Sequence, residues 1–160
     1  MTDSLVDEFD ALYRAHWGRL AGTLRLLCGD AMTADDLAQE AFTLTWVRWT
    51  RVRLLDRPEG WVYVTGFRLA RKRLLREARR PRPDAVPESI EGALDDRVGL
   101  QQALAELPMR KRQAVVARHV LGYDGPTAAT LLGMQPDGFR QLLNRAVSDL
   151  RVSPALLEEA

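Results

Sequence analysis

The chain has 160 residues, 46% of them hydrophobic, which suits one medium domain or two small ones. Its single cysteine, Cys28, excludes an intramolecular disulfide and a zinc site built on cysteines. No apolar run approaches the roughly 18 residues that a membrane-spanning helix needs, and the acidic start MTDSLVDEFD does not resemble a secretory signal. We therefore expect a cytoplasmic protein.

The formal net charge of +1 conceals a strongly basic block. Residues 48–82 carry 12 basic and 3 acidic side chains, whereas residues 1–47 carry 3 and 8, and residues 83–107 carry 1 and 6. Basic blocks of this density commonly contact phosphate backbones, and a solvated arginine-rich helix face is the simpler alternative. The block therefore marks a candidate nucleic-acid contact.

The first half of the chain predicts three helices. Apolar residues recur with helical spacing over Leu5–Cys28, and Gly29 ends that helix. A second helix spans Thr33–Trp49, and its end is not sharply defined over Arg51–Asp56. Pro58 suits the first turn of a third helix, which runs to about Arg79 before a proline-rich stretch stops it.

The second helix combines a capping signal with a large apolar surface. Thr33 and Asp36 fit the capping box, in which each side chain bonds the backbone amide of the other residue. Leu37 lies on one face by the helical period, and Phe42 and Trp46 lie on the adjacent face. Together they give the helix more apolar surface than packing of a short surface helix needs.

A proline-rich acidic segment divides the chain. Residues 81–97 have the composition of a flexible linker. This predicts one domain over residues 1–80, a second over residues 98–152 and a tail at residues 153–160. No segment alternates with a period of two residues, so we expect an all-α fold of two small helical domains.

The second domain ends in a helix-turn-helix pattern. Within a preceding helix, Val120 is expected to face inward. Asp124 can cap a helix that runs through Leu132, and Asp137 can cap a last helix over Gly138–Arg151. In helix-turn-helix proteins such a pair places the second helix in the major groove of DNA, whereas two short helices joined by glycine also occur in helical bundles that bind no DNA.

Nothing in the chain indicates catalysis. The two histidines, His16 and His119, have no nearby acidic or cysteine residues at metal-ligand spacing, and His16 lies within an apolar stripe that favours packing. There is no glycine-rich phosphate loop and no hydrolase motif. We therefore expect no enzymatic activity, cofactor or metal.

The motifs nevertheless occur in an informative order. The second helix carries D-L-A-Q-E-A-F, the third is rich in aromatic and arginine residues, and the domain after the linker opens with L-P-M-R-K-R-Q-A-V-V-A-R-H-V-L-G-Y. In this order they resemble the extracytoplasmic-function sigma factors, which keep only the second and fourth conserved regions of bacterial sigma factors. The resemblance covers about residues 9–80 and 100–151, and it implies a subunit that binds core RNA polymerase and directs promoter-specific initiation.

The resemblance implies a polymerase-binding role for the second helix. In the family, this helix docks on the clamp helices of the polymerase β′ subunit, and the β subunit is a further expected partner. Core packing is the simpler explanation for the two apolar residues of the motif. The residues that match the motif are Asp36, Leu37, Gln39, Glu40 and Phe42.

The resemblance implies that the third helix, with the loop before it, opens the minus-ten promoter element. Rings interleaved with cations suit single-stranded DNA, because bases stack on rings while arginines follow the phosphates. A core position for Trp61 and a solvated face for the arginines are the alternatives. The family's Arg-Asn pair is Phe67-Arg68 here, and its Asp is Lys72. The implied contacts are Trp61, Tyr63, Phe67, Arg68, Arg71, Lys72 and Arg76.

The last helix is implied to lie in the major groove of the minus-thirty-five element, through Arg140, Gln141, Asn144 and Arg145. Leu142 replaces a family arginine, which predicts a weaker electrostatic footprint than in related proteins. An ion pair of Arg145 with the carboxylate one turn later is the alternative for that residue.

Two other functions remain open from the sequence. The chain is also compatible with a sigma-like accessory regulator that binds polymerase or DNA without initiating alone, and with a plain helix-turn-helix DNA-binding regulator. An anti-sigma factor is a further candidate partner, because the linker and the apolar helix faces offer it a surface.

Overall fold

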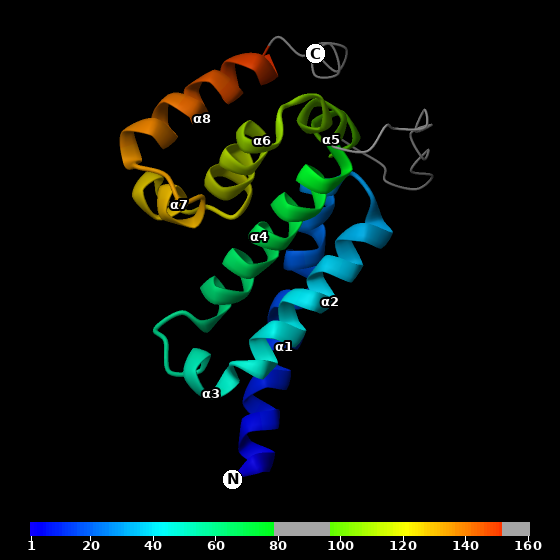
Figure 1. Cartoon of the computed structure of the whole chain (residues 1–160), viewed down its shortest axis with the longest axis vertical. Helices are drawn as coiled ribbons and strands as arrows, with labels where there is room; N and C mark the ends of the chain where they lie inside the picture. Colours follow the sequence, from blue (N-terminus) through cyan, green and yellow to red (C-terminus); the bar gives the residue numbers. More distant parts are fainter. Residues whose placement is uncertain (79–96, 152–160) are drawn as a thin grey trace. The chain divides into compact units, whose positions relative to one another are not determined.

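The computed structural model describes residues 1–78 and 97–151 (Figure 1). Helices account for most of these residues, and no strand occurs in either range, which confirms the all-α class. The chain divides into two compact units, Met1–Arg79 and Arg80–Ala160. The predicted linker lies outside the described residues except for Arg97, and so does the predicted tail.

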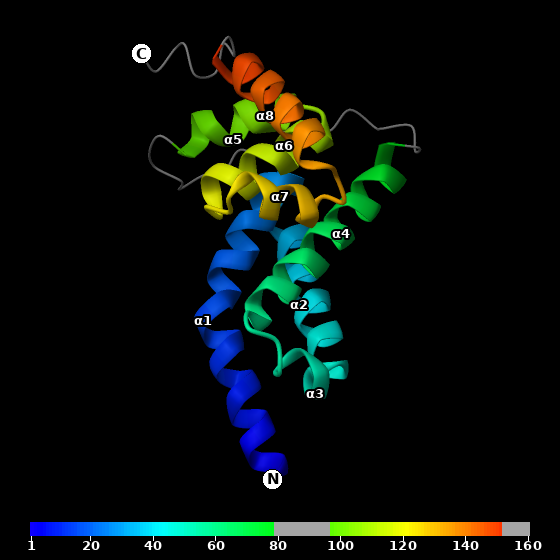
Figure 2. The ribbon, with the colours of Figure 1, turned by 90° about the vertical axis from the view of Figure 1, so that its left-hand side faces the viewer.

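The first unit consists of three long helices and one short one. The three long helices contact one another pairwise, and the short helix contacts the first two (Figure 2). In chain order they are α1 (Thr2–Cys28), α2 (Ala31–Val47), α3 (Trp49–Val52) and α4 (Pro58–Ala78).

Helix α1 ends as predicted. Gly29 adopts φ 75°, a left-handed conformation that glycine tolerates, and its amide donates to the Arg25 carbonyl at 2.8 Å. Leu20 and Leu24 of α1 are fully buried against Gly66 of α4. A methyl group at Gly66 would lie 3.0 Å from Leu20 Cδ1, so α1 and α4 approach closely there.

The predicted capping box of α2 is wrong, because an earlier residue caps the helix. Asp30 accepts hydrogen bonds from the amides of Met32 and Thr33, at 3.3 and 3.1 Å, and from the Thr33 hydroxyl. The bond from the Thr33 side chain is the main cause of a lowered Asp30 pKa, and nearby Arg73 lowers it further. The helix therefore begins at Ala31, and Asp36 is left free of the cap.

The end of α2 also differs from the prediction. The helix stops at Val47 and a separate short helix, α3, begins at Trp49, so the end lies before the Arg51–Asp56 stretch over which the sequence leaves it undefined. The Trp49 indole N–H donates to the Leu5 carbonyl at 3.0 Å, and Arg53 makes a two-bonded ion pair with Glu8 at 2.8 and 2.9 Å. These bonds fix the region after α2 onto the first turns of α1.

The second unit is built from short helices around a long one. Helix α8 contacts α6 and α7, and the π-helical turn η1 contacts both α6 and α7. In chain order they are α5 (Arg97–Glu106), α6 (Met109–Val115), η1 (Val116–Val120), α7 (Gly125–Leu131) and α8 (Pro136–Arg151).

Local signals predict most of the helix-turn-helix. Asp124 caps α7 by accepting from the Thr127 amide at 2.8 Å, and Gly133 has φ 67° in the turn. Two details are wrong. Helix α8 begins at Pro136, so Asp137 lies in its first turn instead of capping it. Val120, expected to face inward, is 37% exposed because the π-helical turn shifts the register of its face.

Candidate protein and nucleic-acid interfaces

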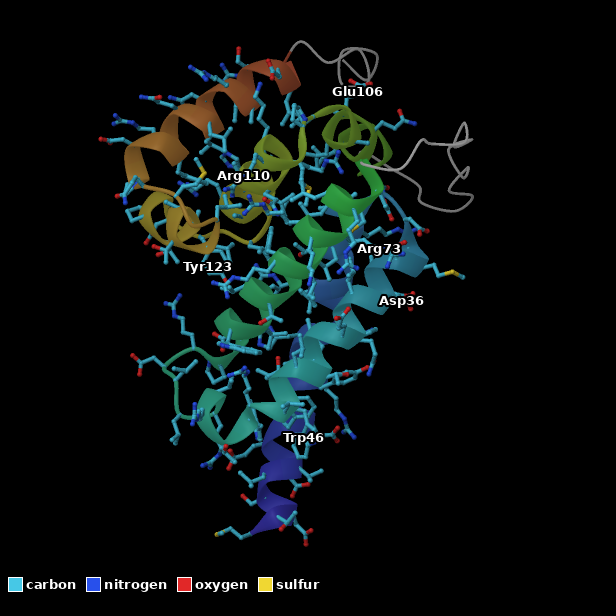
Figure 3. The ribbon with its side chains drawn as sticks, viewed as in Figure 1. Asp36, Trp46, Arg73, Glu106, Arg110 and Tyr123 are labelled. Carbon is cyan, nitrogen blue, oxygen red and sulfur yellow. The ribbon has the colours of Figure 1, made fainter. Side chains whose placement is uncertain are left out.

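Helix α2 separates the residues of its motif into a buried and an exposed set. Leu37 and Phe42 are buried, and the Phe42 ring packs against rings of α1, so both residues hold the bundle. Asp36, Gln39 and Glu40 are exposed and follow one another at helical spacing (Figure 3). Of the five residues predicted to bind polymerase, three thus form an accessible row.

Trp46 is only partly buried. Its side chain is 44% exposed, although its ring meets that of Phe9 edge-on at a centroid distance of 5.0 Å. Trp46 lies near the end of α2, where α1 covers one side of the indole and leaves the other open (Figure 3). An open groove of about 210 Å³ lies beside it, lined by Phe9, Tyr13, Gln39, Phe42, Thr43 and Trp46.

Helix α4 turns its aromatic residues inward. Tyr63 and Phe67 are buried in the core of the first unit, and the Tyr63 hydroxyl lies 3.3 Å from His16 Nδ1. Rings in this position have no face for a base to stack on, so we do not retain them as DNA contacts. Trp61 is partly exposed. His16 is packed beside α4, as its apolar stripe predicts.

The opposite face of α4 is cationic. Arg68, Arg71, Lys72 and Arg76 are all exposed, and their spacing places them on one side of the helix. No carboxylate of the described residues forms an ion pair with any of these four. Arg73 differs from them, because it pairs with Glu77 at 3.1 Å and lies near Asp30. We call the first four residues the α4 cationic face.

The segment between α3 and α4 exposes two apolar residues that the sequence reasoning missed. Leu54 and Leu55 are 75% and 48% exposed, between the exposed cations Arg51 and Arg57. The sequence does contain a signal for them. Two adjacent leucines stand in the middle of the basic block, outside any apolar stripe with helical spacing. An apolar pair in a cationic setting suits insertion between DNA bases.

Helix α8 exposes all four residues predicted to contact DNA: Arg140, Gln141, Asn144 and Arg145. Phe139 and Ala146 are buried on its other side. The alternative pairing for Arg145 is absent from the described residues, because Asp149 binds Lys111 at 2.7 Å.

Contacts within the second unit fix α6 against the helix-turn-helix. Arg110 donates to the Leu132 carbonyl at 2.7 Å, at the end of α7 (Figure 3). Arg112 donates to the carbonyls of Ala105 and Leu107 at 3.2 and 3.0 Å, at the end of α5. These cations complete helix ends and so support the fold.

Within residues 1–78 and 97–151, no helix has the length and apolarity required to cross a bilayer. The same residues contain no cluster of three or more histidine, cysteine or acidic side chains placed to hold a metal ion.

The sequence matches two family models, Sigma-70 region 2 over residues 12–80 and Sigma-70, region 4 over residues 97–150. RNA polymerase sigma-E factor from Streptomyces antibioticus is 30% identical, over 94% of this chain and 87% of that protein. Probable ECF RNA polymerase sigma factor SigI from Mycobacterium tuberculosis is 31% identical over 88% of this chain, which spans about half (53%) of that protein.

A solved structure has the same fold. The sigma factor RpoE from Bartonella quintana, crystallised with the anti-sigma factor NepR, superposes with a TM-score of 0.75 at 18% identity, over 94% of this chain and 97% of that one. The two matched regions and the relatives agree with the motif order of the sequence. The chain belongs to the extracytoplasmic-function sigma factors, which bind RNA polymerase and direct transcription initiation from promoters.

Proposed function

We propose that the exposed row of α2 binds core RNA polymerase, at the clamp helices of its β′ subunit. The observation that carries this proposal is the division within one motif: Leu37 and Phe42 are buried, whereas Asp36, Gln39 and Glu40 are exposed. Exposed polar side chains on a rigid helix fix the register of a protein interface. Within residues 1–78 and 97–151, the side chains of Asp36, Gln39 and Glu40 form no hydrogen bond or ion pair that would give them a structural role.

Paired substitutions test this contact. Gln39→Ala combined with Glu40→Ala should reduce binding to core polymerase in a pull-down, while the helical circular dichroism signal stays unchanged. Asp7→Ala is the matched control, because Asp7 is an exposed carboxylate of α1 and so lies on a different helix from the row. Unchanged binding of the paired variant would exclude the row as the contact.

We assign the minus-ten element to the first unit. The α4 cationic face is suited to the phosphates of the opened strand, because four exposed cations lie on one side of a helix without partners among the described residues. Trp61, Leu54 and Leu55 are then the residues available for contact with bases. Residues 1–80 would form this domain.

We assign the minus-thirty-five element to the second unit, over residues 98–152. Arg140, Gln141, Asn144 and Arg145 carry the guanidinium and amide groups that recognise base edges in the major groove. They are exposed on the second helix of the helix-turn-helix. An anti-sigma factor is a proposed further partner, since the structurally similar RpoE was crystallised with one.

A sigma-like regulator that does not initiate alone is the second candidate. The departures at Phe67, Arg68, Lys72 and Leu142 favour it, because each lies in a helix assigned to promoter DNA. Run-off transcription with purified core polymerase, which supplies the catalysis, decides between the sigma factor and the accessory regulator. We propose that either one acts in the cytoplasm. Promoter-dependent transcripts support the sigma-factor assignment. Binding to polymerase without transcripts supports the alternative.

A further inference from the structure

The groove beside Trp46 lies between α1 and α2. Its volume of about 210 Å³ is below the roughly 300–1,000 Å³ that small-molecule sites occupy. Its walls are mainly aromatic, from Phe9 and Tyr13 of α1 and from Phe42 and Trp46 of α2. A groove of this size and lining suits one bulky apolar side chain of a partner protein better than a free ligand.

The Trp46 ring is held in place before any partner binds. Its neighbour Phe9 also contacts the rings of Trp49 and Phe42, at centroid distances of 5.4 and 6.3 Å. Trp49 is fixed in turn by its hydrogen bond to the Leu5 carbonyl. A partner that covers Trp46 therefore loses little free energy in ordering this ring.

The groove is continuous with the exposed row of α2. Thr43 and Trp46 follow Gln39 by four and seven residues, so all three share one face. Gln39 and Thr43 line the groove and are also joined by a hydrogen bond of 2.8 Å from the Thr43 hydroxyl to the Gln39 carbonyl. Asp36 extends this face toward the start of α2, and Glu40 lies beside Gln39.

The charge of this face indicates the chemistry of its partner. The sequence of α2 contains no lysine or arginine, so Asp36 and Glu40 have no cation on their own helix. The face thus runs from carboxylates to an aromatic groove. A helix that carries lysine or arginine residues, followed within a few turns by a bulky apolar residue, would complement it.

We propose that the groove receives an apolar side chain from a cationic helix of core RNA polymerase, and that Trp46 contributes more to the affinity than any carboxylate of the row. This extends the proposed polymerase contact of α2 and depends on it. Tryptophan in a pocket is the residue type most often found to dominate binding, whereas exposed ion pairs at a rim contribute little.

The test measures the affinity of the full chain for core polymerase. Trp46→Ala should weaken binding by about 30-fold or more, the level that defines a dominant interface residue. Trp46→Phe should restore most of the affinity, because it refills the groove with an aromatic ring. Leu44→Ala is the matched control, since Leu44 is a similarly exposed apolar residue of α2 that does not line the groove.

Salt separates the apolar contact from the charged one. The loss caused by Glu40→Gln should shrink as the ionic strength rises, because salt screens exposed charges. The loss caused by Trp46→Ala should persist. Thr43→Lys is a second variant that keeps Trp46, and the lysine should weaken binding by obstructing the groove and repelling a cationic helix.

The outcomes are distinct. If Trp46→Ala and Thr43→Lys bind normally while Gln39→Ala with Glu40→Ala does not, the groove proposal is overturned and the contact of the row stands. If all of these variants bind normally, the proposed contact of α2 fails as well. If Trp46→Ala instead abolishes self-association measured by light scattering, a second copy fills the groove and the proposal is wrong. Thermal melts by circular dichroism establish that each variant is folded.

Discussion

Helices α4 and α8 are both half-buried and both assigned to promoter DNA, but they present different chemistry to it. The exposed face of α4 carries four cations without partners among the described residues. The exposed face of α8 carries two arginines and two amides, and Arg140 lies 3.7 Å from the exposed Asp137. Cations on phosphates give affinity without sequence information, whereas amides and arginines in a groove distinguish bases. Within these assignments, α4 supplies affinity and α8 supplies discrimination.

Charge removal on α4 should have the largest effect. Arg68→Gln with Lys72→Gln should lower the affinity of the holoenzyme for promoter DNA by about tenfold to a hundredfold at low salt. The slope of log affinity against log salt should become shallower by about 1.5–2, because two phosphate contacts are lost. Fluorescence anisotropy with labelled promoter fragments, over a series of salt concentrations, measures both quantities.

Arg73→Gln is the control for this loss. Arg73 lies on the same helix, but Glu77 already pairs with it. Its substitution should change the salt slope by much less than the double variant does. An equal change would mean that the Arg73–Glu77 ion pair opens when DNA binds. Arg73 would then belong with the α4 cationic face instead of standing apart from it.

Substitution on α8 should act on sequence discrimination instead of overall affinity. Arg140→Ala should reduce the preference of the holoenzyme for its own minus-thirty-five element over a scrambled one by about 10- to 100-fold, the equivalent of roughly 1–3 kcal/mol for one base contact. Affinity for the scrambled element should change little. Competition binding provides the ratio.

Arg151→Ala is the matched control on α8. Arg151 is an exposed arginine in the last turn, far along the helix from the residues that a recognition helix places on bases. Its loss should leave the preference intact. A preference that survives Arg140→Ala would assign discrimination to another surface and remove the contrast between the two helices.

The apolar pair before α4 should have a smaller effect, limited to promoter opening. Leu54→Ser with Leu55→Ser should slow the formation of open complexes by several-fold, because unstacking a base step costs a few kcal/mol that an inserted side chain partly offsets. Permanganate reactivity of unpaired thymines follows the opening. Met32→Ser, a change to an equally exposed apolar residue on α2, should have no effect.

Local signals in the sequence predict much of this structure. The end of α1 at Gly29 and the cap of α7 at Asp124 follow from glycine and aspartate chemistry within a few residues. The sequence places the start of α2 too late, because Asp30 and Thr33 are both good capping residues and lie three positions apart. Asp30 is the cap because α1 ends directly before it, at Cys28 and Gly29. The charge of Arg73 on α4 also lowers the pKa of Asp30, and no local pattern around Asp30 contains this long-range effect.

The candidate site was harder to predict, because exposure depends on which helix covers which face. Phe67 and Arg68 are adjacent in sequence, yet the ring is buried and the guanidinium is exposed. A pattern of interleaved rings and cations is therefore compatible with two structures. One is a surface on which bases stack, and the other is a helix with a buried aromatic face and an exposed cationic face. Trp46 shares a helical face with the buried Phe42, but α1 covers it only in part.

The smallest expected effect concerns Asp30, and it tests whether Arg73 belongs to the fold or to the DNA surface. Asp30→Ala removes the α2 cap and should destabilise the first unit by about 1 kcal/mol, which lowers its melting temperature by about 4–8 °C. All four tryptophans, Trp17, Trp46, Trp49 and Trp61, lie in the first unit, so tryptophan fluorescence follows its unfolding separately from that of the second unit.

The pH dependence of the same cap isolates its charge. The pKa of Asp30 is lowered in the folded state by the bond from Thr33 and by Arg73, so its charge stabilises the fold above the unfolded pKa of about 4. That stability is lost as the pH falls through the folded pKa.

Asn also caps helices well, so Asp30→Asn keeps the cap and removes only the charge. The stability difference between the wild type and Asp30→Asn should therefore be present at pH 7 and disappear as the pH falls below the lowered pKa of Asp30. Arg73→Gln should reduce that difference at pH 7, whereas Arg71→Gln, which removes a cation of the α4 cationic face, should not. If Arg73→Gln leaves the stability difference unchanged, Arg73 does not stabilise the charged cap. It would then be available for DNA, and α4 would not divide into cations that support the fold and cations that bind DNA.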